Sequence, residues 1–362
     1  MIRYLHQWAR NRIGKPVLPL ELILFATGRC TFRCKHCFIS KFETDSSTDL
    51  SLEVINQLAS DLPALMVLML TGGEPFLRDD LSELVRIFAI RSQPKVVSIA
   101  TNGFLTEKCV EMVEQILTLP EFHSQLVVTV SFEGIGQDHD NNRGNPHAYE
   151  KALATARLLK DVRFRYPNLS VGANMTLIRE NETKVISAVR ELANLDLFSF
   201  LTQNMYREAK PFSAFHQIDL HLYRELSRFV QSYSTTFDMS GNLILGRWHH
   251  YKERYQASLI ERTCDTNTYQ GVPCEAGRGI GMVYSDGRVA PCELYPPDWG
   301  NIKEKSFSDI WNAKGNREFS EQVRSKKCFC THECFLSASL NLQLAPMLTC
   351  LRWNLLQGNH QG

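Results

Sequence analysis

The feature that most constrains the fold of this chain is a sixfold alternation of apolar, strand-like runs with helical stretches. The strand-like runs cover 20–27, 65–72, 95–103, 126–134, 169–178 and 197–204. Helical periodicity occupies the gaps, roughly at 51–61, 79–92, 106–118, 146–164 and 182–194. Near-continuous apolar strands separated by helices indicate a parallel sheet with right-handed crossovers. Because six such units are two fewer than a closed barrel contains, we predict an α/β fold built on a partial (βα)6 TIM-like barrel.

Glycine-rich or polar motifs follow the first four of these strands. They read ATGRC, TGGEP, TNG and SFEG in chain order. In parallel α/β folds ligands bind at the carboxyl ends of the strands, where these motifs fall. The sequence therefore predicts one site at that end of the barrel.

Three cysteines crowd the first of these loops. Cys30, Cys34 and Cys37 are separated by three and by two residues, in a chain with eleven cysteines. Closely spaced thiols without a secretory signal indicate metal binding more often than disulfides. Three thiolates can hold an iron–sulfur cluster and leave one iron open. A zinc site would need a fourth ligand, and His36 lies too close in sequence to two of the thiols to supply it.

Taken with the motifs after the next strands, the cysteine triplet resembles the signature of the radical S-adenosylmethionine (SAM) enzymes. The resemblance implies a [4Fe–4S] cluster whose open iron binds the amino and carboxylate groups of SAM. One electron from the cluster then cleaves the sulfonium and yields a 5'-deoxyadenosyl radical, which abstracts hydrogen from a substrate. A flavodoxin- or ferredoxin-type electron donor is implied as well.

The resemblance also suggests residues that bind SAM. In TGGEP, Gly72 and Gly73 would allow a close backbone approach, and Glu74 would accept hydrogen bonds from the cofactor's ammonium. In ATNG, Thr101 and Asn102 would lie near the adenosine. A turn that merely ends the strand explains Thr101 and Asn102 equally well.

Later motifs extend the expected cofactor site. By the same resemblance, Ser131 in SFEG would lie near the ribose or the carboxylate, and Arg143 would pair with the methionyl carboxylate. Asn174 on the fifth strand would reach the ribose. Solvated loop residues are the competing interpretation of Ser131 and Arg143.

A second cysteine-rich region follows the barrel. Cys274 and Cys292 bracket a hairpin-like GMVYSDGRVAP with Asp-Gly turn chemistry. Downstream, CFCTHEC supplies Cys328, Cys330 and Cys334, and Cys350 lies near the end of the chain. The region resembles the SPASM or twitch type of extension, which holds auxiliary iron–sulfur clusters, although the CFCTHEC spacings are shorter than usual.

The auxiliary ligand set is expected to be Cys274, Cys292 and Cys334 with Cys330 or Cys350. With Cys264 this region has seven thiols, a number that fits one or two auxiliary [4Fe–4S] clusters. A zinc knot held by four thiolates is the alternative. Cys109, in a helical stretch, is predicted to be a small buried residue.

These observations suggest a basic, helix-like extension at 1–19, a radical SAM barrel at 20–205 and connecting helices with an iron–sulfur domain at 206–362. The extension carries four basic residues and no signal-peptide core. It is expected to pack as a solvated helix across a barrel end, with a position on a membrane surface as the alternative. With no apolar run of about eighteen residues, we expect a cytoplasmic protein without a transmembrane segment. A net charge of +1 gives no indication of nucleic-acid binding.

The expected function is hydrogen abstraction from a peptide or protein side chain, in maturation or peptide natural-product modification. A dehydrogenase or cyclase acting on a small sugar or cofactor precursor is an alternative within the same class. A non-catalytic iron–sulfur electron carrier would explain the cysteines but not TGGEP or the sixfold layout. A zinc-stabilised scaffold is the last alternative.

Overall fold

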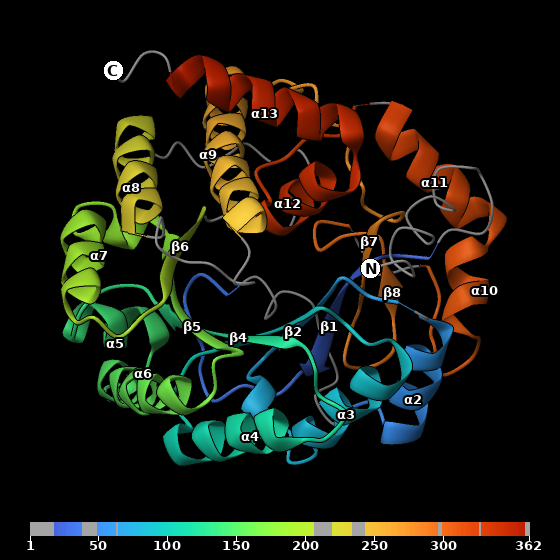
Figure 1. The fold of residues 1–362 in the computed structure, drawn as a ribbon, viewed down its shortest axis with the longest axis horizontal. Helices are drawn as coiled ribbons and strands as arrows, with labels where there is room; N and C mark the ends of the chain where they lie inside the picture. The colour runs from blue at the N-terminus through green and yellow to red at the C-terminus, as the bar shows by residue number, and fades with distance from the viewer. Residues whose placement is uncertain are drawn as a thin grey trace.

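The computed structural model describes residues 18–37, 49–62, 64–205, 219–233, 243–295, 299–325 and 327–358. Among these residues the strands form one sheet of eight, in the order β6-β5-β4-β3-β2-β1-β7-β8. Strands β1 to β6 run parallel, each paired with its neighbour in the sequence. The sheet curves into an open barrel with helices along its outer side (Figure 1). The predicted partial barrel is confirmed.

All six predicted strands are present, with ends within a few residues of those expected. They are β1 (Glu21–Thr27), β2 (Val67–Gly72), β3 (Val96–Thr101), β4 (Gln125–Phe132), β5 (Leu169–Leu177) and β6 (Phe200–Met205). In β4 the even-numbered residues Leu126, Val128 and Val130 are fully buried, whereas Gln125, Thr129 and Ser131 are half-buried. Each β4 side chain thus points either into the helix layer or into the barrel, as the two-residue period of a strand dictates.

The helices between the strands also follow the predicted pattern. They are α2 (Leu52–Asp61), α3 (Leu81–Arg91), α4 (Thr106–Thr118), α6 (Ala148–Arg165) and α7 (Val185–Asn194). Short elements that the periodicity does not reveal are η2 (Pro75–Leu77), α5 (Gln137–Arg143) and η3 (Arg179–Asn181). Cys109 is fully buried on α4, as predicted.

The remaining helices complete the ring on the side opposite α4 (Figure 1). They are α8 (Leu220–Tyr233), α9 (Leu243–Thr266), α10 (Phe307–Asn312), α11 (Lys314–Ser325), α12 (Glu333–Leu342) and α13 (Leu344–Gly358). Residues 206–218, at the start of the region predicted to contain connecting helices, lie outside the described residues, as does most of the extension 1–19. No single helix among the described residues is long and apolar enough to cross a bilayer, although α12 and α13 reach that length and composition as a sharply bent pair.

The expected hairpin after residue 274 is an extension of the barrel sheet. Strand β7 (Ile280–Val283) pairs antiparallel with β8 (Val289–Ala290) and parallel with β1. The turn uses Gly287 at a φ of 94°, a left-handed conformation that favours glycine. The cysteine-rich region therefore begins at the edge of the same sheet that carries the first cysteine loop.

Helix α12 covers the inner face of β1 and β7. Ile23 and Phe25 of β1 pack with Met282 of β7 and with Phe335 and Ala338 of α12 in one apolar cluster. At the start of β1, Glu21 is 3 % exposed, and one of its carboxylate oxygens has no partner among the described residues. Burial raises the pKa of Glu21 to about 7, although the charge of Lys252 and a hydrogen bond to Asn341 oppose the rise.

The variant Glu21→Gln is expected to gain stability relative to the parent protein as the pH rises. Between about pH 4.5 and 7 the folded protein keeps a proton that the unfolded chain has released, so the stability of the parent falls with rising pH in this window. The free energy of unfolding of Glu21→Gln relative to the parent should increase by on the order of 3 kcal/mol from about pH 5 to about pH 8. Denaturant titrations at both pH values measure this difference, and parallel pH profiles for the two proteins would contradict it.

Candidate active site

The loop after β2 lies directly against the cysteine loop after β1. The backbone amides of Gly73 and Glu74 donate to the carbonyls of Thr27 (2.9 Å) and Arg29 (2.8 Å). A Cβ on Gly73 would lie 1.9 Å from the Arg29 carbonyl oxygen, so only glycine permits this approach. The paired glycines therefore hold the second loop against the residues that lead into Cys30.

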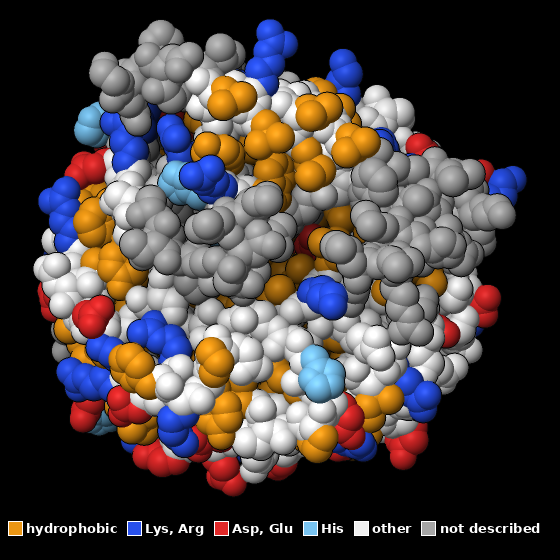
Figure 2. All heavy atoms as spheres, viewed as in Figure 1, with side chains coloured by type: hydrophobic (Ala, Val, Ile, Leu, Met, Phe, Trp, Pro, Cys, Tyr) orange, Lys and Arg blue, Asp and Glu red, His pale blue; other side chains and the backbone are white. Residues whose placement is uncertain are grey.

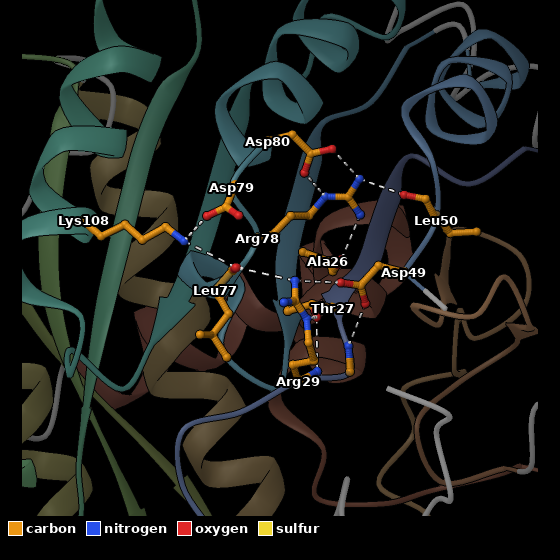
Figure 3. A network of polar contacts seen from close by, with 11 residues as sticks. Ala26, Thr27, Arg29, Asp49, Leu50, Leu77, Arg78, Asp79, Asp80 and Lys108 are labelled. Atoms are coloured by element: carbon orange, nitrogen blue, oxygen red, sulfur yellow. Dashed lines mark hydrogen bonds and ion pairs between the residues drawn. The ribbon is translucent and has the colours of Figure 1, made fainter. Parts of the chain in front are cut away.

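An arginine network braces the base of these loops (Figure 3). The guanidinium of Arg78, 4 % exposed, donates to the carbonyls of Ala26 (3.1 Å) and Leu50 (2.7 Å) and forms an ion pair with Asp80. Asp49 accepts from the Gly28 amide and pairs with Arg29 (3.1 Å). These contacts fix the end of β1 to the segment that enters α2. The cysteine loop therefore begins at a firmly held position.

Glu74, in the loop after β2, is buried at 1 % exposure. One carboxylate oxygen accepts from the Thr101 hydroxyl (2.8 Å) and the Phe76 amide (3.2 Å), and the other accepts from the Asn102 amide (2.8 Å). Glu74 and Thr101 thus tie the loops after β2 and β3 together. Among the described residues the second oxygen accepts only from the Asn102 amide and keeps a further lone pair, so a contact between Glu74 and the cofactor's ammonium stays a prediction.

Asn102 reaches the cysteine loop instead. Its Nδ2 donates to the Thr31 hydroxyl (3.1 Å) and lies 3.9 Å from Cys30 Sγ. Its Oδ1 accepts from the Phe104 amide (2.9 Å), which fixes the orientation of the side-chain amide. The structure therefore brings Asn102 to the cluster loop and keeps Thr101 in the support beneath it.

The three thiols of the loop are neighbours and are partly exposed. Burial raises the pKa of Cys30, and the charges of Glu74, Cys34 and Cys37 add to the rise. Among the described residues no three Cys, His, Asp or Glu side chains converge closely enough to hold one metal ion. Three thiolates from one loop suit a cluster that leaves one iron open, whereas a structural zinc site normally takes four ligands.

Arg143 meets the triplet at Cys34, with a guanidinium nitrogen 3.5 Å from the sulfur. It is the last residue of α5, which Gly144 terminates in a left-handed conformation. Its Nε lies 2.6 Å from Glu133, and its remaining terminal nitrogen is buried without a partner among the described residues. An orphaned guanidinium nitrogen beside a cluster thiol is where a carboxylate would bind.

Glu133 is a buried carboxylate between Arg143 and His36, and the sequence alone did not single it out as a site residue. It is 1 % exposed and lies 3.5 Å from the His36 ring. Burial alone would raise the pKa of Glu133, but the charges of Arg143 and His36 outweigh burial and hold the pKa at about 2. Glu133 therefore carries a negative charge at neutral pH and links the cysteine loop to α5.

Ser131 and Asn174 lie side by side on the inner face of the sheet. They are paired in register between β4 and β5, and Asn174 is paired with Thr202 on β6. The Thr202 hydroxyl donates to Asn174 Oδ1 (2.9 Å). The structure thus places both predicted residues in one polar row, near the carboxyl ends of their strands.

The second cysteine group gathers around β7, β8 and the start of α12. Burial raises the pKa of Cys274 well above its usual value, and neighbouring Cys330, Cys292 and Cys328 add to the rise. Cys328 also accepts a hydrogen bond from Tyr295, and burial raises its pKa to about 11. Cys334, on α12, packs against the same apolar cluster as Cys274 and Cys292. Five thiols therefore share one neighbourhood.

The structure places Cys350 apart from the other thiols of the expected auxiliary set. Its thiol is fully buried on α13, donates to the Tyr251 carbonyl (3.4 Å), and packs with Tyr255 and Leu259 of α9 in a separate cluster. None of the other cysteines contributes to its pKa, which burial raises to about 11. Cys328, which the sequence analysis left out of its preferred set, lies with the other thiols instead.

A buried ion pair connects the hairpin that carries Cys292 to the CFCTHEC segment. His332 pairs with Glu293, which follows Cys292, and both residues are less than a tenth exposed. The His332 amide donates to Cys330 Sγ (3.4 Å). The short CFCTHEC spacing thus places a histidine where it can anchor its own cysteines to the hairpin.

The fold and the paired cysteine groups define an iron–sulfur enzyme of the radical type. A family model described as the radical SAM superfamily matches residues 24–192, and one described as an iron–sulfur cluster-binding domain, SPASM, matches residues 274–335. The chain belongs to the radical SAM superfamily, with a SPASM domain after the barrel. Its cofactors are SAM, a [4Fe–4S] cluster and auxiliary iron–sulfur clusters.

Relatives in this superfamily differ in the molecules that they process. The chain is 26 % identical over 320 residues to the AdoMet-dependent heme synthase of Methanosarcina barkeri, covering 85 % of this chain and 87 % of that protein. It is 22 % identical to the sporulation killing factor maturation protein SkfB of Bacillus subtilis, covering 91 % and 75 %. The fold matches Streptococcus suis SuiB bound to precursor peptide SuiA, with a TM-score of 0.59 and 16 % identity over 90 % of this chain and 70 % of that one.

The residues present fit the radical SAM cofactors. Cys30, Cys34 and Cys37 would hold the cluster, and the free guanidinium nitrogen of Arg143 would meet the carboxylate of SAM. When bound, the cluster and SAM supply the electron and the carbon radical for hydrogen abstraction. The protein's own part is to fix the loop through Gly73 and to orient Arg143 through Glu133.

Proposed function

We propose that this enzyme abstracts hydrogen from a side chain of a peptide or protein. Support comes from the inner face of the sheet beyond Ser131, where Asn174, Thr176, Thr202 and Asn204 present only uncharged polar groups. The other inward-facing residues of β4, β5 and β6, which include Gln125, Ser170 and Phe200, are also uncharged. Amide and hydroxyl groups of this kind suit a peptide backbone, which presents one donor and one acceptor per residue. One relative is named as a maturation protein of the sporulation killing factor, and one structural neighbour was solved with a precursor peptide.

In this proposal Ser131 and Arg143 orient SAM, and Asn102 supports the cluster loop. The auxiliary cluster, held by Cys274, Cys292 and the CFCTHEC cysteines, would accept the electron released after hydrogen abstraction or bind substrate through an open iron. We place the reaction in the cytoplasm, where thiols are kept reduced, with a flavodoxin- or ferredoxin-type protein as the electron donor.

A second candidate is modification of an iron porphyrin. The observation that favours it is the match to the heme synthase of M. barkeri, which extends over 87 % of that protein. A porphyrin with propionate groups would ask for cations around its edge. Because the inward positions of β4 to β6 carry none, a porphyrin would depend on residues beyond these strands.

The peptide proposal predicts a change of mass in a peptide. The reconstituted enzyme, SAM and dithionite are incubated anaerobically with a peptide fraction from the organism that encodes this enzyme. A parallel reaction contains iron coproporphyrin III instead. Mass spectrometry is expected to find a peptide that has lost hydrogen only when SAM and the cysteine triplet are both present. Conversion of the porphyrin, with an unchanged peptide fraction, would transfer the assignment to the second candidate.

A matched variant tests the polar row itself. Asn174→Leu is expected to lower turnover of the substrate by about tenfold or more, because the substrate group that Asn174 would bind loses its hydrogen-bond partner. Formation of 5'-deoxyadenosine without substrate should stay within about twofold of the parent, since the cysteine loop is untouched. Equal losses in both assays would place Asn174 with the cofactor instead of the substrate.

A further inference from the structure

Helix α13 carries an unusual apolar stripe on its outer face. Leu344, Leu348, Leu351 and Leu355 are 47 %, 64 %, 37 % and 67 % exposed. Spacings of four, three and four residues place all four leucines on one side of the helix. The opposite side is buried through Pro346, Cys350 and Asn354. Four neighbouring exposed leucines form a contiguous apolar patch, and such patches mark interaction surfaces.

The surroundings of this stripe are basic. No Asp or Glu occurs between Cys334 and the end of the chain, and Arg352 is exposed on α13 itself. Figure 2 shows hydrophobic side chains gathered over α13 near the top of the molecule, with Lys, Arg and His side chains to their left over α8 and α9. The face therefore combines apolar contact area with positive charge.

A groove of about 660 Å³ between α8, α9 and α13 carries part of that charge. Arg228 and Arg254 line it together with His250, and the Arg254 guanidinium lies 6.0 Å from the centre of the Trp353 ring. The groove also contains the ion pair of Arg224 with Glu261. Exposed Arg228 has no hydrogen bond or ion pair with any other described residue.

The opposite end of α13 adjoins the start of the described chain. Leu20 lines one pocket together with Leu344, Ala345 and Pro346. The sequence before Leu18 contains Arg3, Arg10, Arg12 and Lys15 and no acidic residue. Among the described residues, Arg278 and Arg324 line this pocket together with Glu275, so cationic side chains lie near both ends of the leucine stripe.

We propose that this face binds the surface of an anionic phospholipid bilayer. The leucines of α13 would enter the boundary between headgroups and acyl chains, while Arg352, Arg254 and Arg228 would meet lipid phosphates. Trp353, with its ring beside Arg254, has the amphipathic character that favours the same depth. A stable protein interface usually needs about 20–30 residues on each side, far more than this single helical stripe supplies. The net positive surroundings fit a negative membrane and not a second copy of the same basic face.

Vesicle sedimentation tests the proposal with the full-length, reconstituted protein. Vesicles of phosphatidylcholine alone are compared with vesicles that also contain phosphatidylglycerol. We expect binding to the anionic vesicles that high salt weakens. The double variant Leu348→Gln and Leu355→Gln should lower the partition coefficient by at least about tenfold, and Arg352→Gln should lower it about fivefold.

The matched control is Leu158→Gln with Phe164→Gln, which removes two apolar side chains of α6 that are 43 % and 73 % exposed. This control should bind vesicles as the parent does, and thermal melts should show that all variants are folded. Absence of binding to anionic vesicles, or binding that the leucine variant leaves unchanged, overturns the proposal. So does a dimer in analytical ultracentrifugation that the leucine variant dissociates, because the stripe would then be a contact between two copies.

Discussion

Replacing Cys30, Cys34 and Cys37 together by alanine is expected to abolish the formation of 5'-deoxyadenosine from SAM. The three thiols lie in one loop, braced by the Gly73 and Arg78 contacts. They would hold the cluster, which would supply the electron for cleavage of the sulfonium. The variant should lose about four irons per chain and keep those of the auxiliary group. Iron and sulfide counting after anaerobic reconstitution, with 5'-deoxyadenosine measured after dithionite is added, checks both parts.

The control for this experiment is Cys264→Ala, which removes a thiol on α9 whose raised pKa reflects burial and no neighbouring cysteine. It should keep the iron content and the activity of the parent. If the triple variant still forms 5'-deoxyadenosine at a rate near that of the parent, the triplet is not the reducing site. If it instead loses all iron, the auxiliary group depends on the first loop for its assembly.

The barrel could be predicted from the sequence because its signals are local. Strand β5 and helix α4 begin and end within a residue of the predicted positions, since long apolar runs and helical periodicity decide them. The parallel pairing of β7 with β1 could not be predicted. A strand of four residues carries no mark of a partner more than 250 positions away in the sequence.

The same distinction explains the outcome at the cysteines. The triplet and the hairpin cysteines were visible as spacing, and spacing is a local property. Whether Cys328 or Cys350 joins the auxiliary group depends on how α12 and α13 turn, because α13 directs Cys350 toward α9. The role of Glu133 is also hidden in the sequence, since His36 and Arg143 approach it from two separate loops.

Substitutions of Glu133 are expected to have the second large effect, on both stability and SAM binding. Glu133→Ala would leave the guanidinium of Arg143, 8 % exposed, without its anionic partner. Removing one member of a buried ion pair typically costs about 3–5 kcal/mol. Glu133→Gln keeps the shape and one acceptor but loses the charge, so its cost should be smaller. Chemical denaturation of the cluster-free proteins measures this difference without any contribution from the cofactors.

The pH dependence of this effect has a definite sign. Because the pKa of Glu133 is held at about 2 in the folded protein, against roughly 4.3 for an unperturbed glutamate, its contribution is fully present above about pH 5. That contribution is lost as the pH falls toward 2. The stability difference between the parent and Glu133→Gln should therefore be constant at neutral pH and shrink in acid. A difference that grows as the pH falls would contradict the charged state assigned to Glu133.

SAM binding separates the positioning role from the structural one. With Glu133 in place, the Nε of Arg143 is fixed and one terminal nitrogen stays free for a carboxylate. Glu133→Gln should weaken SAM binding by about tenfold, measured as the concentration that perturbs the EPR spectrum of the reduced cluster. Asp138→Asn, on the same helix α5, removes only an exposed ion pair with Lys184 and should change neither stability nor binding appreciably. If Glu133→Gln unfolds more easily but binds SAM as tightly as the parent, then Glu133 stabilises the loop without orienting Arg143.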